Sequence, residues 1–500
     1  MRKTLALWLI GVLAAAPGAA PPLPTPLETA GHSRYSRSDE ISVYLDRLAM
    51  AAPALARKDV VGHSVQGRSI EALVIGTPDR SGGVQRLTVL LVGSQHGGAE
   101  PAGGEALLEI ARDLTGGDLR PLLDTLTVIV IPNANPDGRE LRRRSNANRV
   151  NINTDFVLLT QPESRALVAA LHRYAPQAVL DLHESAVLKR KTLAREGYLT
   201  DFDAQVEIGN NPALPAGVQA LARDTLLPAL IARIAAGGLP AQHYIGEITS
   251  SRQPIRNGGL TLRNFRNTAA AAGALSVLIE TRLDPHHDRF PTYRNIAERV
   301  ARQRLCIRSF LAEIAARRRE IGKRTDAARR PVAGSELPLF ADYAQDPRHS
   351  TVTLPLRRLD TRTLAPVTFP DHRRVVTADT VRVPARLYVT AHTTPLAALL
   401  DRHGIRYDVL GRPRRETVTT DRYTQRPGAT GRVGLAAERR AERELPGGSL
   451  VIDLAQPGGL TALLLLDPRS TSSVFRYPDW AAWIKPGRDF FVHRSADRTP

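Results

Sequence analysis

Four apolar runs of strand length recur in the first 280 residues of the chain, and each is nearly continuous instead of alternating with polar residues. They span residues 87–92, 127–131, 178–182 and 275–279. Unbroken apolar character is typical of strands that are buried on both faces of a sheet. Helical patterns lie between the runs, for example at residues 100–114 and 161–174. Strands that alternate with helices predict an α/β/α sandwich around a mixed, mostly parallel sheet.

Potentially reactive polar side chains follow or end each of these runs. His96 follows the first run, Asn133, Asn135 and Asp137 follow the second, His183 follows the third, and Glu280 follows the fourth. Sites in open α/β sheets form at the carboxyl ends of the strands. We therefore expect these side chains, which are distant in sequence, to meet in one crevice.

The segment "GSQHGGAEPAGGEALL" (93–108) places His96 and Glu100 among glycines at a strand-to-helix junction. A hydrolytic zinc ion needs three protein ligands and one open position for water. His96, Glu100 and His183 would supply such a set, and Gly97 and Gly98 allow backbone conformations that other residues avoid. The alternative for a lone histidine here is a hydrogen-bonded side chain at a strand end. The chain contains no HExxH motif, which excludes a helix-borne zinc site of the thermolysin type.

The length of 500 residues indicates two or three domains. Residues 1–20 combine a basic start, an apolar core and small residues, which predicts a signal peptide and a secreted or periplasmic location. The apolar core is too short for a stable membrane span, although an uncleaved tethering helix is the alternative. We expect a linker at 21–37, a catalytic domain at 38–322, a second linker at 323–337, and an accessory domain at 338–500.

The predicted accessory domain differs from the rest of the chain in its sequence pattern. Short β-like runs with turn signals dominate it, and one helix is expected at 393–404. We predict a β-rich α+β domain there, with no obvious chemistry of its own.

Composition excludes two classes of site or function. Cys306 is the only cysteine, so neither an intrachain disulfide nor a zinc site made of thiolates can form, and its apolar setting indicates a helix core. The formal charge of +18 suggests nucleic acid, but only six of the 68 basic residues are lysine and arginine is spread along the whole chain. No stretch has the interleaved aromatic residues on which bases stack, so we predict no nucleic-acid partner.

Five segments, in order, resemble those of the zinc carboxypeptidases of the pancreatic type. They are "GHSVQGRSIEAL" (62–73), "HGGAE" (96–100), "NPDGRELRRRSNANRVNINTDF" (135–156), "DLHES" (181–185) and "VLIETR" (277–282). The resemblance covers about residues 40–320. It implies a zinc-peptidase/phosphorylase-like fold and one zinc ion per chain.

The resemblance also implies a role for individual residues. His96, Glu100 and His183 would hold the zinc ion, and Glu280 would act as the general base. Arg144 would stabilise the oxyanion of the intermediate and contact the substrate. Asn153 would bind the substrate carboxylate, and Tyr244 would contact the substrate from a loop. Asp181 would hydrogen-bond a ligand imidazole.

The chain departs from the family pattern at two places. The family spaces its first two ligands as H-x-x-E, whereas His96 and Glu100 are spaced H-x-x-x-E, so the extra residue must be absorbed as a bulge or Glu105 or water must take the place of Glu100. Thr154 also stands where the family has an arginine that grips the terminal carboxylate. Arg263 and Arg266 are the candidates to replace it.

We therefore predict an exported zinc-dependent metallocarboxypeptidase that hydrolyses peptide bonds, with a peptide or an acylated amino acid as substrate. One alternative is a zinc-dependent deacylase or amidase that acts on acylated amino acids or peptidoglycan stem peptides, which Thr154 favours. Another is a non-catalytic, degenerate peptidase-like binding protein, which the ligand spacing favours. The sequence predicts no stable membrane span after signal removal, and it does not indicate an oligomeric state.

Overall fold

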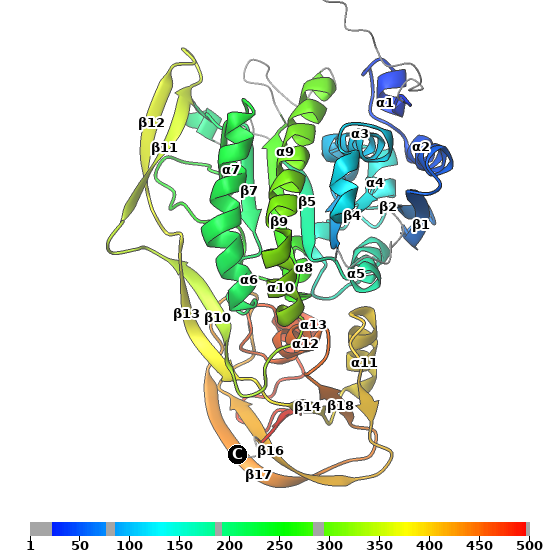
Figure 1. Ribbon diagram of the computed structural model, residues 1–500. Helices are drawn as coiled ribbons and strands as arrows, with labels where there is room; N and C mark the ends of the chain where they lie inside the picture. The colour runs from blue at the N-terminus through cyan, green and yellow to red at the C-terminus, as the bar shows by residue number, and fades with distance from the viewer. Residues whose placement is uncertain (1–22, 77–85, 186–192, 284–294, 497–500) are drawn as a thin grey trace, which may run out of the picture.

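An eight-stranded sheet lies at the centre of the N-terminal part of the protein (Figure 1). The computed structural model describes residues 23–76, 86–185, 193–283 and 295–496. The strand order is β1-β2-β4-β3-β5-β9-β7-β8, and β4, β3, β5 and β9 run parallel to one another. The strands are β1 (Ala56–His63), β2 (Ser69–Ile75), β3 (Leu87–Val92), β4 (Leu126–Ile131), β5 (Ala178–Ser185), β7 (Ala204–Ile208), β8 (Ala241–His243) and β9 (Leu275–Arg282). The expected mixed, mostly parallel sheet is confirmed.

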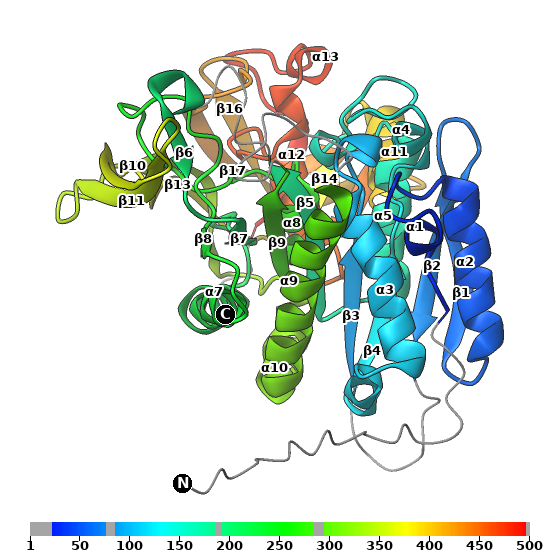
Figure 2. The same cartoon turned by 90° about the horizontal axis from the view of Figure 1, so that it is seen from above.

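Helices cover both faces of this sheet, as Figures 1 and 2 show. They are α1 (Pro26–Thr29), α2 (Ser38–Ala51), α3 (Ala102–Gly116), α4 (Pro136–Glu140), α5 (Pro162–Tyr174), α6 (Ala216–Leu221), α7 (Leu227–Ala236), α8 (Phe265–Ala271), α9 (Ile296–Ala316) and α10 (Arg318–Ala328). On strand β3, Val89 and Leu91 belong to the buried cluster that includes residues of α3, α7 and α9, whereas Leu90 and Val92 belong to the cluster that includes residues of α5 and α8. Because successive side chains of a strand point to opposite faces, a sheet between two helical layers needs the unbroken apolar run seen in the sequence. Cys306 is fully buried within α9, as expected.

Strands β5 and β9 are longer than their apolar runs predicted. The sequence placed His183 and Glu280 just beyond the strands, or at their ends, whereas both residues lie inside them. The parallel backbone pairing continues from Ala178 and Leu275 to Ser185 and Arg282. Polar side chains do not interrupt a ladder that is held together by backbone groups, so the end of an apolar run does not mark the end of a strand.

The C-terminal part is rich in strands, as predicted, and contains three sheets. Its strands are β10 (Glu336–Ala344), β11 (Thr351–Arg358), β12 (Leu364–Pro370), β13 (Arg374–Arg382), β14 (Arg386–Val389), β15 (Asp408–Val409), β16 (Arg414–Tyr423), β17 (Leu435–Leu445), β18 (Leu450–Asp453) and β19 (Val492–Ser495). Its helices are α11 (Thr393–Arg402), α12 (Gly459–Leu466) and α13 (Pro478–Ala481). The hairpin β11–β12 forms a sheet with β6 (Tyr198–Thr200) of the N-terminal part.

The two parts of the chain share a hydrophobic core. Leu262 and Ala270, from the region of α8, belong to the same buried cluster as Leu396 and Leu463 of the C-terminal part. Helix α10 continues to Ala328 and β10 begins at Glu336, so the linker expected from residue 323 starts inside a helix. Among the described residues, no helix is both long enough and apolar enough to cross a membrane. The expected signal peptide lies outside these residues.

One buried histidine of the C-terminal part is hydrogen-bonded to the N-terminal part, and its ionisation is coupled to folding. His403, at the end of α11, donates from Nε2 to the backbone carbonyl of Val157 over 2.9 Å. Burial lowers the pKa of His403 from 6.5 to about 4. Between these pH values the unfolded chain binds a proton that the folded chain excludes, so His403 costs stability as the pH falls.

We expect acidification from pH 7 to pH 5 to destabilise the wild-type protein by about 2 kcal/mol more than the His403→Gln variant. Urea unfolding of both proteins at the two pH values measures this difference. Glutamine keeps a donor for Val157 but does not titrate. Equal losses in both proteins would contradict the role of His403.

Candidate functional site

The carboxyl ends of the parallel strands bring the predicted site residues together. His183 of β5 and Glu280 of β9 are register partners in adjacent parallel strands, so their side chains project from the same face of the sheet. His96 and Glu100 come from the loop that follows β3. His96, Glu100 and His183 are buried, and each offers a ligand atom within 4.8 Å of the others. The imidazole ring centroids of His96 and His183 are 4.9 Å apart.

The loop between His96 and Glu100 accommodates the unusual ligand spacing. Residues Gly97–Ala99 form a single 3-10 turn, in place of the strand bulge suggested by the sequence, and Gly97 has a φ of +51°. A Cβ atom at Gly97 would overlap the backbone of Gly138, so both the positive φ and the close approach require glycine. The turn directs Glu100 back toward His96 and His183.

Glu105 has a separate, structural role. It forms an ion pair with the buried Arg139 over 2.8 Å and accepts hydrogen bonds from the backbone N–H and the hydroxyl of Ser36. Both partners of the ion pair are about 1% exposed. Glu105 is therefore not available as a substitute ligand, and that alternative is wrong.

The surroundings of His183 leave its Nδ1 free to bind a metal. Nε2 lies 3.0 Å from a carboxylate oxygen of Asp181, which also accepts a hydrogen bond from Gln95. A proton on Nε2 that is donated to Asp181 leaves the lone pair on Nδ1, 3.2 Å from Glu100 Oε2. Asp181 thus lies where the resemblance placed a partner for a ligand imidazole.

His96 also offers an imidazole nitrogen without a partner. Its Nδ1 is buried and makes no hydrogen bond, while Arg144 Nη2 lies 2.8 Å from its Nε2. Arg144 also forms an ion pair with Glu100. Two imidazoles and one carboxylate, all buried, are a donor set that suits zinc, and the unpartnered Nδ1 of His96 leaves one ring nitrogen available to a ligand.

Burial and neighbouring charges oppose each other in the pKa values of this cluster. Burial lowers the pKa of His96 to about 3. Burial also acts to lower the pKa of His183, but the charges of Asp181 and Glu100 outweigh it and raise this pKa to about 10. Burial would raise the pKa of Glu100, yet His96, His183 and Arg144 hold it far below its ordinary value. Glu100 is therefore ionised and His96 is neutral, as metal ligands must be, whereas His183 is protonated in the absence of a metal and would lose a proton when one binds.

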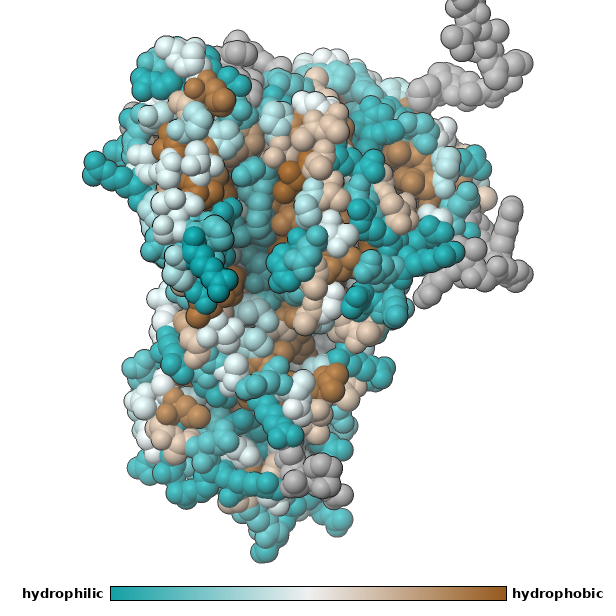
Figure 3. Space-filling model, turned by 60° about the vertical axis from the view of Figure 1, so that its left-hand side comes forward, coloured by the Kyte–Doolittle hydropathy of each residue, from teal (hydrophilic) through white to brown (hydrophobic). Residues whose placement is uncertain are grey.

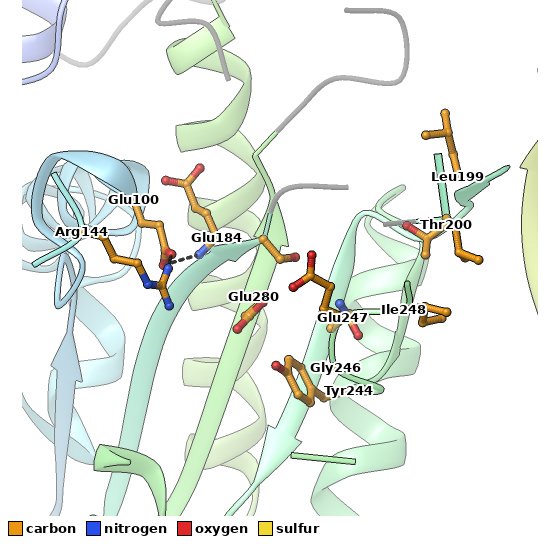
Figure 4. A pocket seen from close by; sticks show the side chains of 13 residues that line it. Glu100, Arg144, Glu184, Leu199, Thr200, Tyr244, Gly246, Glu247, Ile248 and Glu280 are labelled. Atoms are coloured by element: carbon orange, nitrogen blue, oxygen red, sulfur yellow. Dashed lines mark hydrogen bonds and ion pairs between the residues drawn. The ribbon is translucent and has the colours of Figure 1, made fainter. Parts of the chain in front are cut away.

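Glu280 stands at the centre of a pocket beside this cluster (Figure 4). Burial, and then the negative charge of Glu100, raises its pKa, against the opposing charges of His183 and Arg144. Tyr244 lines the same pocket, and the nearby Glu280 carboxylate raises the pKa of its phenol. A carboxylate with a raised pKa is a stronger proton acceptor than an exposed one.

Asn153 lies beside the cluster, in the 3-10 turn Ile152–Thr154. Its Oδ1 accepts from the backbone N–H of Phe265 over 3.0 Å, which directs Nδ2 toward His183 Nε2 at 3.3 Å. If Nε2 carries a proton, this contact joins two donors, so the Asn153 amide group still has a donor for another molecule.

The residues considered for carboxylate recognition differ in their exposure and in their hydrogen-bond partners. Thr154 is exposed and donates from its hydroxyl to the carbonyl of Asn151. Arg263 is exposed on the loop before α8. Arg266 is 3% exposed, and its guanidinium donates to the side chain of Asn210 and the carbonyl of Gly259. The Nε atom of Arg266 is buried without a hydrogen-bond partner.

Several residues of the pocket were not identified from the sequence. Leu193, Leu199 and Ile248 form an apolar wall, and the carboxylate of Glu247 projects into the pocket in Figure 4. These residues come from the segments around β6 and β8, which are too short to be recognised as strands by periodicity.

Comparison with known proteins shows which family the chain resembles. Residues 41–188 match the family model described as zinc carboxypeptidase. Carboxypeptidase 2 of Trichophyton rubrum is 26% identical over 270 residues, which cover 52% of this chain and 50% of that protein. Carboxypeptidase D of Mus musculus is 29% identical over 153 residues, which cover 28% of this chain and 11% of that protein. The resemblance expected from the five segments is confirmed.

One solved structure matches part of the chain. The metallo-carboxypeptidase of Burkholderia cenocepacia is 20% identical, with a TM-score of 0.45 over 57% of this chain and 70% of that one. The chain spans about half the length of the curated carboxypeptidase 2 proteins that it matches. The family model covers His96, Glu100, Arg144, Asn153 and His183, whereas Glu280 lies beyond it.

We expect two neighbouring glutamates to respond differently to the same change. Glu100→Gln should remove most of the bound zinc because it removes a charged ligand. Glu105→Gln should retain zinc but lower the free energy of unfolding by about 3–5 kcal/mol, since it leaves the buried Arg139 without its counter-ion. Metal analysis by mass spectrometry and urea unfolding measure the two effects. If Glu105→Gln lost its zinc while Glu100→Gln kept it, the metal-ligand role would belong to Glu105 and not to Glu100.

Proposed function

We propose that this chain, whose residues 41–188 match the zinc carboxypeptidase family, is an exported metallocarboxypeptidase that hydrolyses peptide bonds. One observation carries the proposal. Three buried ligand side chains converge within 4.8 Å, and a carboxylate with a raised pKa stands opposite one of them in the neighbouring strand. The residues present fit one zinc ion, held by His96, Glu100 and His183. When bound, zinc would polarise the substrate carbonyl and lower the pKa of a water molecule to about 7.

The side chains of the protein would divide the remaining tasks. Glu280 takes a proton from the attacking water and returns it to the leaving amine nitrogen. Arg144 donates hydrogen bonds to the carbonyl oxygen as negative charge develops on it. A proton on His96 Nε2, which metal binding at Nδ1 requires, would make that nitrogen a donor. It would then no longer accept from Arg144, and the guanidinium could turn to the substrate.

Asn153 and Tyr244 would orient the peptide. Asn153 Nδ2 has a free donor beside His183, and Tyr244 lies across Glu280 from Arg144 in Figure 4. Arg263 or Arg266 would bind the terminal carboxylate, because Thr154 stands at the position where the family has an arginine for this task.

A deacylase or amidase that acts on acylated amino acids or peptidoglycan stem peptides is the second candidate. It is favoured by Thr154, because no arginine stands at that position. A non-catalytic binding role is disfavoured by the convergence of Glu100 on both histidines.

Replacing Glu280 should separate catalysis from metal binding. We expect Glu280→Gln to keep its zinc and to lower kcat by about 100- to 10,000-fold, the range for loss of a general acid–base group. Zinc content and the rate of hydrolysis of a model peptide check this result. The matched variant Glu247→Gln, from the same pocket, should retain most of its kcat. A fully active Glu280→Gln would show that another residue is the base.

A peptide panel should decide between exopeptidase and amidase activity. We expect peptides with a free C-terminal carboxylate to be cleaved at least about tenfold more efficiently than their amidated counterparts, because a charge-assisted hydrogen bond is lost in the amides. Mass analysis of the products identifies the bond that is cleaved. Equal cleavage of both forms would support the deacylase or amidase alternative. Tests on Arg263→Gln and Arg266→Gln identify which arginine binds the carboxylate.

A further inference from the structure

The pocket loop Tyr244–Ile255 has almost no regular structure of its own. It follows β8 and supplies Tyr244, Gly246, Glu247 and Ile248 to the pocket. Apart from an isolated β-bridge at Ile255, none of its residues belongs to a strand or helix. Its shape must therefore be imposed by what packs against it.

A hydrophobic cluster holds this loop against the C-terminal hairpin. Ile245, Ile248 and Ile255 are at most 5% exposed. They share a buried cluster with three residues of the hairpin β11–β12, which are Leu354, Leu356 and Phe369. All three hairpin side chains are fully buried, although the hairpin lies at the outside of the molecule (Figure 1). The side of the molecule brought forward in Figure 3 shows scattered hydrophobic residues among hydrophilic ones.

Backbone hydrogen bonds fix the register between the loop and the hairpin. The N–H of Ile255 donates to the carbonyl of Pro370 over 2.8 Å, and the N–H of His372 donates to the carbonyl of Ile255 over 2.9 Å. Ile255 thus adds to the end of β12 like a short strand. A second contact follows beyond the loop, where the hydroxyl of Tyr343 in β10 donates to the carbonyl of Gly258 over 2.6 Å.

The same hairpin also contacts a second segment of the pocket wall. Strand β11 pairs with β6 in antiparallel register, with Leu356 opposite Thr200 and Arg357 opposite Leu199. Leu199 and Thr200 both line the pocket. Arg357 also forms an ion pair with Asp201, directly after β6. One hairpin therefore contacts two separate segments of the pocket wall.

We infer that the hairpin β11–β12 is a positioning element for substrate binding, which holds the loop that follows Tyr244 and the apolar wall of the pocket in place. This inference rests on the proposed hydrolytic function. The hairpin lies outside residues 41–188, which match the family model. It makes the C-terminal part a component of the pocket, whose removal would cost substrate affinity.

Truncating one buried hairpin side chain tests this inference. In Leu356→Ala, we expect backbone amides of residues 244–255 to exchange with solvent deuterium at least about tenfold faster, since local opening becomes easier. Amides of β3 and β5 should keep their protection, and zinc content should stay the same. The KM for a model peptide should rise about tenfold, while kcat changes less than threefold. Leu356→Val should show smaller changes in the same direction if the alanine variant does not fold.

Two controls separate positioning from general destabilisation. Leu400→Ala truncates an equally buried leucine in the core of the C-terminal part, which belongs to a different hydrophobic cluster from the loop. Thr353→Ala changes an exposed residue on the same strand as Leu356. Neither should accelerate exchange at residues 244–255.

The outcomes distinguish failure of the inference from failure of the proposed function. Unchanged exchange of the loop in Leu356→Ala, or equal acceleration in Leu400→Ala, would overturn the inference, whether or not the protein hydrolyses peptides. Faster exchange with an unchanged KM would also overturn it, because the loop would then not position substrate. An inactive wild-type protein with a hairpin-dependent loop would instead contradict the hydrolase assignment. Binding of a non-hydrolysable peptide would then decide the positioning role.

Discussion

The parallel pairing of β5 with β9 is the constraint on which the rest of the structure depends. It sets His183 directly opposite Glu280, so the spacing between the proposed metal ligand and the proposed base is fixed by backbone hydrogen bonds instead of by flexible loops. Both side chains emerge from the rigid centre of the sheet, where the flanking strand residues are buried between two helical layers. The variable parts, such as the turn after β3 and the loop after β8, only have to approach this fixed pair.

Placing so many charges in a dry interior requires each to have a partner. Glu184, next to His183, forms a bidentate ion pair with Arg299 at 2.7 and 2.9 Å, and Glu105 pairs with Arg139. Removing one member of such a pair leaves an uncompensated charge and is strongly destabilising. Gln303 of α9 ties the same region together, since its amide donates to the carbonyl of His183 and to the hydroxyl of Thr281. Helix α9, which packs against the sheet, therefore also holds the strands of the site in place.

Much of this architecture could be predicted from the sequence, because the central strands carry continuous apolar runs and polar residues follow them. The gathering of His96, Glu100, His183 and Glu280 follows from that pattern. Two features could not be predicted. The turn at Gly97–Ala99 depends on a close approach to Gly138, far along the chain. Strands β6 and β8 have three residues each, too few to show a period, and they owe their conformation to neighbours such as β11.

The pairing of β6 with β11 has a consequence for the order in which the protein matures. A ribosome makes β11 only after about 150 further residues have followed β6, so all strands of the central sheet precede it in synthesis. A nascent chain that ends before β11 has the proposed metal ligands but lacks the outer support of its pocket. The pocket would then be complete only after residue 358 has been synthesised, later than every strand of the central sheet.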